Sequence, residues 1–185
     1  MRCQLAKLFT LHFSTLVVTP TCSITRCKLE AAMSDFRIRD LQPEDCRELV
    51  NMIKELAEFE GLPEQVKITE ENGPWLTVGY AMYFYSYGTW VGRMIYLEDL
   101  YIKPQYRGKG IGTSMMTKVA QIGVENECQR MQWVVLNWNQ GAIDFYKKHD
   151  SIDLTSDEKW HLFRMEREEL RKFATLHDQT VVKGC

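Results

Sequence analysis

The chain has 185 residues, a formal net charge of −2 and 45% hydrophobic residues, which predicts one globular domain with a sizeable core. The near-neutral charge gives no general case for binding nucleic acid or an anionic membrane, and no apolar run is long enough to span a bilayer. The six cysteines form no CxxC pair and no cysteine–histidine grouping with zinc spacing. We therefore expect free thiols in a reducing compartment and no metal.

Residues 1–33 differ in composition from the rest. They are rich in serine, threonine and basic residues, and the first acidic residue is Glu30. A mitochondrial presequence shares the acid-poor composition, and a secretory signal shares the short apolar stretch Leu8–Val18, but neither matches fully. We expect a disordered leader, with a targeting peptide or a structural strand as alternatives. The folded unit would then begin at Met33-Ser34.

The ordered pattern begins at Phe36–Arg39, where apolar and basic residues alternate as in a short strand. Pro43 suits the first turn of a helix, and apolar residues at helical spacing predict that this helix ends before Gly61. The next two strands form a hairpin with a turn at Gly88-Thr89. The two hairpin strands are at 77–87 and 92–102, and later strands are expected at 131–138 and 160–165. Helices are expected at 110–126 and 139–148. A last helix follows the strand at 160–165 and ends at about residue 174, before a loose tail at 175–185.

This order of elements predicts an α/β protein of the α+β type. An antiparallel hairpin is followed by strand, helix, strand, helix and strand. Such a chain forms a mixed sheet with helices packed on it.

The stretch RGKGIG, Arg107–Gly112, lies between a predicted strand and a predicted helix. Glycines allow a tight turn whose N–H groups approach a ligand, and the helix start adds the positive end of its dipole. Arg107 and Lys109 add full charges, so we predict an anion site suited to a pyrophosphate, with a solvated basic turn as the alternative. Lys109 stands too early for a Walker loop, and Thr113 occupies the last glycine position of a dinucleotide fingerprint.

Arg107-x-x-Gly110-x-Gly112 matches the Q/R-x-x-G-x-G/A signature of the GNAT N-acetyltransferase superfamily. The stretches LAEFE, EQVKITEE, YLEDLYIKPQYRGKGIG, NWNQGAIDFYKK and EKWHLF resemble the spermidine/spermine N1-acetyltransferase family, and within it the diamine or thialysine acetyltransferases. The resemblance covers about Phe36 to Ala174. It implies a GNAT domain at residues 34–174, with the leader at 1–33 and the flexible tail at 175–185.

The resemblance also implies an activity. Acetyl-CoA would be the co-substrate, and a small cationic amine such as thialysine, a diamine or a polyamine would receive the acetyl group directly, in a ternary complex. Family members are dimers, so a homodimer is expected, without nucleic acid or membrane partners. We expect a cytoplasmic protein, or a mitochondrial one if residues 1–33 act as a presequence.

Roles for particular residues follow from the resemblance alone. Tyr146 matches the catalytic tyrosine that protonates the departing thiolate, and Glu98 matches the acid that binds the amine and draws off its proton, directly or through water. Strand N–H groups near Leu100 would stabilise the oxyanion. The implied acetyl-CoA contacts are Leu100, Tyr101, Ile102, Arg107, Gly108, Lys109, Gly110, Ile111, Gly112, Thr113, Asn139, Gln140, Gly141, Ala142 and Tyr146.

The implied amine contacts include several acidic residues, which suit a cation. For those outside the Glu98-Asp99 pair, a solvated or packing role is an equal alternative. The full set is Phe59, Glu60, Glu98, Asp99, Gln132, Trp133, Val134 and Glu158.

The sequence departs from the family's pattern in three places. Where family members carry a longer segment with a whole strand, residues 72–77 are only NGPWLT, so we expect a sheet that lacks one strand in its N-terminal half and has a gap or open edge. Leu11–Val18 is a candidate replacement. Gly88 stands where the polyamine-specific branch has Asp, which favours a smaller amine. Asp150 replaces a glycine at a left-handed helix cap.

Two other activities remain open from the sequence. One is a protein acetyltransferase that acts on lysine side chains or N-termini. The other is an inactive or weakly active CoA-binding isoform, which the missing strand suggests.

Overall fold

The structure is a computed structural model that describes residues 13–20, 36–66 and 77–175. The chain forms two units, Met1–Leu136 and Asn137–Cys185. Within the described ranges, no helix is both long enough and apolar enough to cross a membrane.

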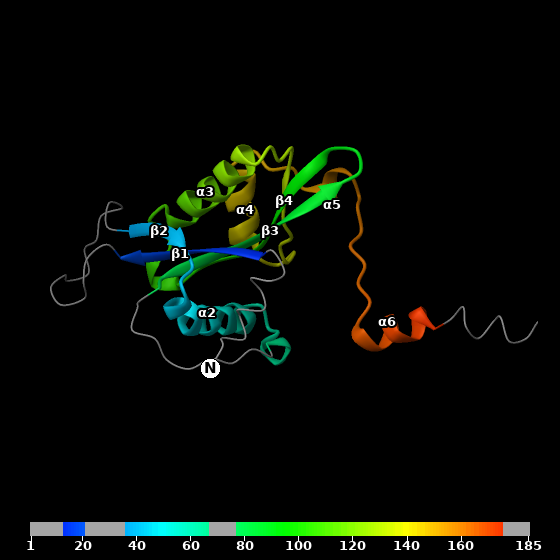
Figure 1. Ribbon diagram of the computed structural model, residues 1–185, viewed down its shortest axis with the longest axis horizontal. Helices are drawn as coiled ribbons and strands as arrows, with labels where there is room; N and C mark the ends of the chain where they lie inside the picture. Colours follow the sequence, from blue (N-terminus) through cyan, green and yellow to red (C-terminus); the bar gives the residue numbers. More distant parts are fainter. Residues whose placement is uncertain (1–12, 21–35, 67–76, 176–185) are drawn as a thin grey trace, which may run out of the picture. The chain divides into compact units, whose positions relative to one another are not determined.

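The first unit is built on a five-stranded mixed sheet of order β2-β1-β3-β4-β5 (Figure 1). The first four strands in this order pair antiparallel, and β4 pairs parallel with β5. This confirms the mixed α/β architecture. The strands are β1 (Phe13–Pro20), β2 (Phe36–Asp40), β3 (Gly79–Gly88), β4 (Gly92–Ile102) and β5 (Met131–Gln132).

β1 lies in the interior of this sheet, between β2 and β3. Val18 is opposite Ile38 on one side and Gly79 on the other. Leu16, Val17 and Val18 are at most 2% exposed, because a strand with neighbours on both edges and helices on both faces buries side chains of either orientation.

The expectation of an unstructured or targeting leader is therefore wrong for Phe13–Pro20. The expected gap is also filled, since β1 lies between β2 and β3 in the sheet. The alternative of a replacement strand at Leu11–Val18 is the one that the structure supports. The β-branched and aromatic run FSTLVVT explains the choice, because it suits a two-sided buried strand.

One helix packs on each face of the sheet (Figure 1). On one face α2 (Cys46–Phe59) buries Leu49, Val50 and Met52 against side chains of β1, β3 and β4. On the other, α3 (Ile111–Glu125) buries Met115 and Val119 against the opposite side of the same strands. Short 3-10 turns, each opened by a proline, precede α2, follow it, and lead toward α3; they are η2 (Pro43–Asp45), η3 (Pro63–Gln65) and η4 (Pro104–Tyr106).

Two predicted strands differ from the structure. The strand expected at 131–138 is reduced to Met131–Gln132, because β5 pairs with β4 only opposite Ile95 and Tyr96. Val134 is 59% exposed rather than buried between helices. The strand expected at 160–165 does not form, since these residues have no ladder partner among the described parts of the chain. An apolar pattern needs a neighbouring strand to become part of a sheet.

The described residues of the second unit form helices and loops. Its helices are α4 (Gln140–Lys147), α5 (Leu154–Asp157) and α6 (Arg167–Ala174). Asp150, after α4, has a φ of 57°, which confirms the left-handed conformation expected where a glycine was replaced. The predicted tail lies outside the described residues except for Thr175.

Candidate active site

A bulge in β4 brings two carboxylates to the same face of the sheet. Met82 on β3 pairs with Asp99, but the next β3 residue pairs with Leu97, so Glu98 is the extra residue. The bulge shifts the alternation of β4, because Leu97 packs on the α3 face whereas Tyr101 packs on the α2 face. Glu98 and Asp99 lie between Leu97 and Tyr101 in the strand, and both therefore point to the α2 face.

Glu60, Glu98 and Asp99 form an acidic cluster on this face, and the name is used below for these three residues. Glu60 is at the C-terminal end of α2. The pKa of Asp99 is raised to about 6, first by burial and then by the negative charges of Glu98 and Glu60, against the lowering effect of a hydrogen bond from Tyr80. Burial also raises the pKa of Glu60. A cation placed here would relieve the repulsion between these carboxylates.

Tyr80 is a site residue that the sequence analysis missed. Its side chain is 0% exposed, and its hydroxyl donates a hydrogen bond to Oδ2 of Asp99 at 3.1 Å. The signal was present in the hairpin pattern: Tyr80 is opposite Tyr101 in the ladder, and Asp99 is two residues from Tyr101 on the same face. A buried tyrosine in this register requires a partner for its hydroxyl.

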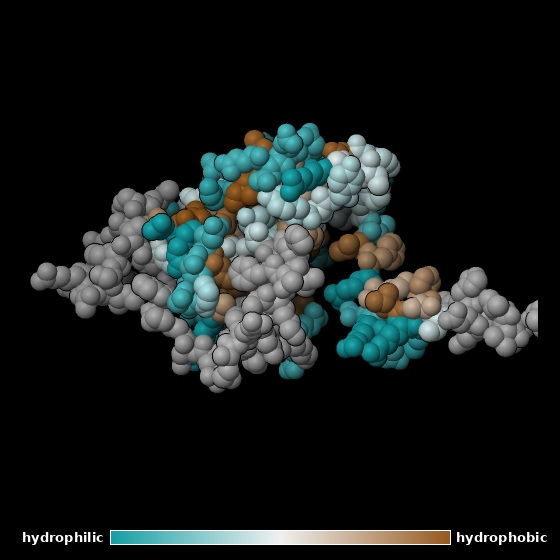
Figure 2. Space-filling view, in the orientation of Figure 1, coloured by the Kyte–Doolittle hydropathy of each residue, from teal (hydrophilic) through white to brown (hydrophobic). Residues whose placement is uncertain are grey.

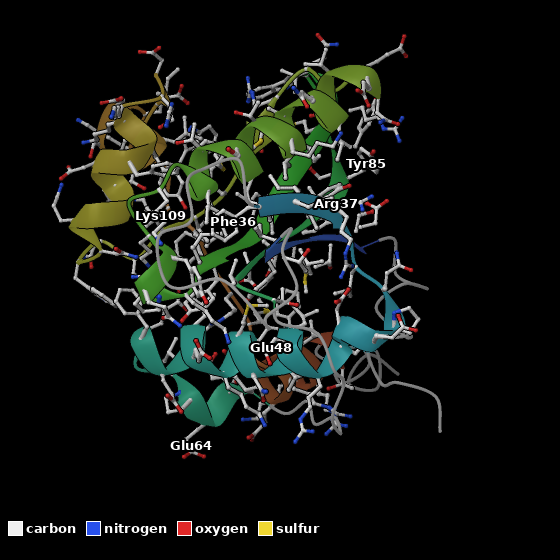
Figure 3. All side chains as sticks on the ribbon, turned by 90° about the vertical axis from the view of Figure 1, so that its left-hand side faces the viewer. Phe36, Arg37, Glu48, Glu64, Tyr85 and Lys109 are labelled. Carbon is white, nitrogen blue, oxygen red and sulfur yellow. The ribbon has the colours of Figure 1, made fainter. Side chains whose placement is uncertain are left out.

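The glycine loop before α3 has the backbone of an anion site. Gly108 and Gly110 have φ values of 74° and 76°, in the left-handed region that favours glycine. A Cβ added to Gly108 would meet nothing within 4 Å, so the backbone here is open to a ligand. Figure 3 shows Lys109 on this loop. The first turn of α3 adds N–H groups that lack intrahelical acceptors, so the loop fits the pyrophosphate of acetyl-CoA.

Arg107 connects this loop to the other side of the site. Its Nε donates to the carbonyl oxygen of Ile102 at 2.8 Å, at the end of β4. Its guanidinium carbon lies 5.6 Å from the ring centroids of both Phe59 and Tyr101. Arg107 was expected to contribute positive charge to the pyrophosphate site. It thus also contacts Phe59 and Tyr101, which were expected to line the amine and pantetheine sites.

Polar contacts also hold the end of β4 against α2. The Tyr101 hydroxyl donates to Oε2 of Glu55 at 2.8 Å, and burial together with Glu55 raises the pKa of Tyr101 to about 12. Lys103 forms ion pairs with Glu48 and Glu55. Glu48 is on α2 in Figure 3. These contacts fix the strand end that was expected to lie beside the pantetheine arm.

β4 has an unpaired edge in this same region. Its ladder with β5 ends at Tyr96 and Gln132, so Leu100–Ile102 have no strand partner on that edge among the described residues. Backbone groups of Leu100 on this edge are therefore available to a ligand, whereas the Ile102 carbonyl already accepts the hydrogen bond from Arg107.

The expected substrate residues 132–134 lie on β5 and directly after it. Gln132 lines a shallow hollow with Trp90 and Met94 of the hairpin, and no residue of the acidic cluster lines it. Trp133 packs against the core on the α3 face, which is a packing role, and Val134 is exposed.

In the second unit, the expected site residues are on or beside α4 and α5. The Asn139 side chain accepts a hydrogen bond from the Ala142 N–H at 3.3 Å and so caps α4. The Tyr146 ring makes an edge contact with Phe145, with centroids 5.4 Å apart. Glu158 accepts a hydrogen bond from Trp160 at 2.8 Å. Gln140 and Gly141 begin α4.

These geometric features are accompanied by a direct match of sequence: residues 33–150 match the acetyltransferase (GNAT) family. The chain belongs to this family. It is similar to thialysine N-epsilon-acetyltransferase from Bos taurus, with 40% identity over 169 residues that cover 77% of this chain and 99% of the bovine protein. The corresponding protein of Caenorhabditis elegans is 35% identical over 158 residues, with the same coverage.

A human relative, spermidine/spermine N(1)-acetyltransferase-like protein 1, is 35% identical over 78% of this chain and 24% of its own length. The 169 positions aligned with the bovine protein exceed 77% of a 185-residue chain, so the bovine protein has positions that this chain lacks. This agrees with the short segment at 72–77.

Solved structures share the fold. An integron cassette protein from the mobile metagenome of V. cholerae has a TM-score of 0.56 and 22% identity, over 86% of this chain and 97% of its own. An aminoglycoside N-acetyltransferase solved in complex with CoA has a TM-score of 0.52 and 16% identity, over 71% of this chain and 99% of its own. At these identities the likeness concerns the fold alone.

Proposed function

We propose that this chain is an acetyl-CoA-dependent N-acetyltransferase whose acceptor is a primary amine of a small cationic substrate, namely thialysine, a diamine or a polyamine. The observation that carries the proposal is the acidic cluster on the same unit as the glycine loop. The cluster attracts a cation, and the loop suits an anion. The curated relatives support the choice of an amine, and the family supports acetyl-CoA as the donor.

The proposed reaction uses this chain's residues for binding and proton transfer. Backbone N–H groups of Gly108–Thr113 hold the pyrophosphate, and N–H groups near Leu100 stabilise the oxyanion. Glu98 takes the ammonium proton, which leaves a lone pair on nitrogen to attack the thioester carbon. The carbon–sulfur bond then breaks and Tyr146 protonates the thiolate, while the second proton lost by the new amide nitrogen restores the Tyr146 phenol through solvent. The role of Tyr146 rests on its match to the family motif.

We propose a preference for a small amine over spermine. Gly88, at the end of β3, stands where the polyamine-specific branch has a carboxylate. A Cβ at this position would approach Val91 Cγ2 to 3.0 Å and Met94 Sδ to 3.2 Å, so the local packing is adjusted to glycine. The hairpin therefore offers neither the charge nor the space for the additional carboxylate.

The proposed partner is a second copy of this chain. Leu162 and Phe163 are 82% and 89% exposed, and α6 has Leu170 and Phe173 beside charged residues. Figure 2 shows hydrophilic and hydrophobic residues of α6 on separate sides. Exposed apolar residues of this kind mark interaction surfaces.

We propose the cytoplasm as the compartment. Among the described cysteines, Cys128 has a free thiol, which fits a reducing environment.

The test is calorimetric titration of the full chain with acetyl-CoA, followed by turnover on thialysine, diamines, polyamines and lysine peptides. We expect saturable acetyl-CoA binding and acetylation of the small amines. Acetylation of peptides alone would indicate a protein acetyltransferase. Binding without turnover on any acceptor would indicate an inactive CoA-binding isoform.

A further inference from the structure

Tyr80 is buried beside the acidic cluster and forms a hydrogen bond with Asp99, one of its three residues. Its ring packs in the apolar cluster on the α2 face, and its centroid is 6.2 Å from that of Tyr101. Its hydroxyl, 3.1 Å from Oδ2 of Asp99, is the polar end of an otherwise buried side chain. The mechanism proposed above gives this residue no role.

The direction of this hydrogen bond is fixed by the protonation of the phenol. Burial, and then the charge of Asp99, raise the pKa of Tyr80 well above its ordinary value of 10.0, so the phenol keeps its proton. A protonated phenol beside a carboxylate donates, and donation stabilises the ionised carboxylate more than the neutral acid.

The other groups that act on Asp99 have the opposite effect. Burial disfavours its charge, and so do Glu98 on β4 and Glu60 at the end of α2. Of the groups from β3, β4 and α2 that shift Asp99, Tyr80 alone favours the ionised form. The charge of Asp99 near neutral pH therefore depends on this hydroxyl.

We infer that Tyr80 is a positioning residue for amine binding, which holds the Asp99 carboxylate ionised and directed toward the cationic group of the substrate. The inference rests on the proposed function, because it assumes an ammonium ligand. It makes affinity for the cation depend on Tyr80, while proton transfer and thioester chemistry stay with other residues.

The test is Tyr80→Phe, which removes one oxygen and keeps the ring. We expect KM for the amine to rise about twofold at pH 7 and about tenfold at pH 5, with kcat and acetyl-CoA affinity changed less than about twofold. The acid limb of kcat/KM against pH should move up by about one unit. The matched control is Tyr83→Phe on the same strand, whose buried hydroxyl bonds Ser14 on the opposite face; it should change none of these quantities.

A double-mutant cycle with Asp99→Asn separates positioning from packing. Asp99→Asn should raise KM for the amine and make Tyr80→Phe silent, both in KM and in the position of the acid limb. Additive effects of the two substitutions, or an unchanged KM in folded Tyr80→Phe, would each overturn the inference. The absence of turnover by the wild-type chain on every amine would overturn the proposed function itself.

Discussion

The backbone N–H of Val78 donates a hydrogen bond to the carbonyl oxygen of Val18, with 2.9 Å between nitrogen and oxygen. The bond joins β1, which lies outside the family match at 33–150, to the residue just before β3. The Leu41 N–H makes the same kind of bond to the Thr15 carbonyl, also at 2.9 Å. Among the strands that the structure describes, β2 pairs with β1 alone.

Removal of residues 1–33 should unfold the protein. Leu16, Val17 and Val18 are buried, and loss of three such side chains costs more than about 5 kcal/mol, which is comparable to the whole stability of an ordinary domain. Chemical denaturation of a chain that starts at Met33 should show no cooperative transition. A chain that lacks only residues 2–10 keeps β1 and serves as the control; equal stability of the two would refute the role of β1.

Gly108→Ala should weaken acetyl-CoA binding about tenfold. The added methyl group has open space, so its effect comes from the left-handed backbone, which costs an alanine about 1 kcal/mol or shifts the loop. Gly92→Ala is a matched control, since Gly92 has a φ of 85° and the same open space, at the hairpin turn where β4 begins. Calorimetry should show a weaker Kd for Gly108→Ala alone, while both variants lose similar stability.

Arg107→Ala should also weaken acetyl-CoA binding, by about tenfold or more, because the loop loses its bond to the Ile102 carbonyl. Arg107→Lys should not restore binding, since a lysine has no Nε–H at that place and no planar group to lie over Phe59 and Tyr101. Arg93→Ala, which removes a similar contact with Tyr85, is the control. Full rescue by lysine would contradict the positioning role and leave only a role for charge.

Stability should fall as pH rises from about 4 to about 6 through the titration of Asp99. The pKa of this group is raised from 3.8 to about 6 in the folded state, so in this window the folded chain holds a proton that the unfolded chain has released. The contribution is on the order of 3 kcal/mol. Unfolding free energies of the wild type and Asp99→Asn, measured across this range, should differ in slope; parallel curves would show that the pKa is not raised.

Tyr146→Phe should lower kcat by about a hundredfold or more, with little change in the Kd for acetyl-CoA, because the variant loses the proton donor and keeps the ring. Tyr87→Phe, at an exposed position of the hairpin, controls for the loss of a phenol. Unchanged turnover in Tyr146→Phe would remove this residue from the mechanism.

Much of the first unit was predictable because its signals are local. β4 has the bounds expected from its pattern, Gly92–Ile102, and α3 begins one residue after its expected start. The glycine loop was recognisable because its function needs particular residue types at particular spacing. The same holds for Asp150, whose left-handed φ followed from the glycine that it replaces.

The remainder depends on neighbours that are distant in the sequence. A period of two places Glu98 and Asp99 on opposite faces of a strand, and only the bulge against Met82 brings them together. Residues 133–136 and 160–165 have strand patterns but lack ladder partners among the described residues. β1 could not be assigned as a strand with certainty from its own residues. A short apolar stretch carries no local signal of its strand partners, which here are β2 and β3.

The interior position of β1 has a consequence for synthesis of the chain. β1 leaves the ribosome first, yet its two neighbours, β2 and β3, emerge later, and β3 is complete only at Gly88. Pairing across such a separation must pay the entropy of closing a long loop before it gains burial. The nascent segment around Leu16–Val18 can pair with β2 once Asp40 has emerged, but its other edge has no partner until β3 is complete at Gly88, which makes it a point where chaperone binding would decide the yield of native protein.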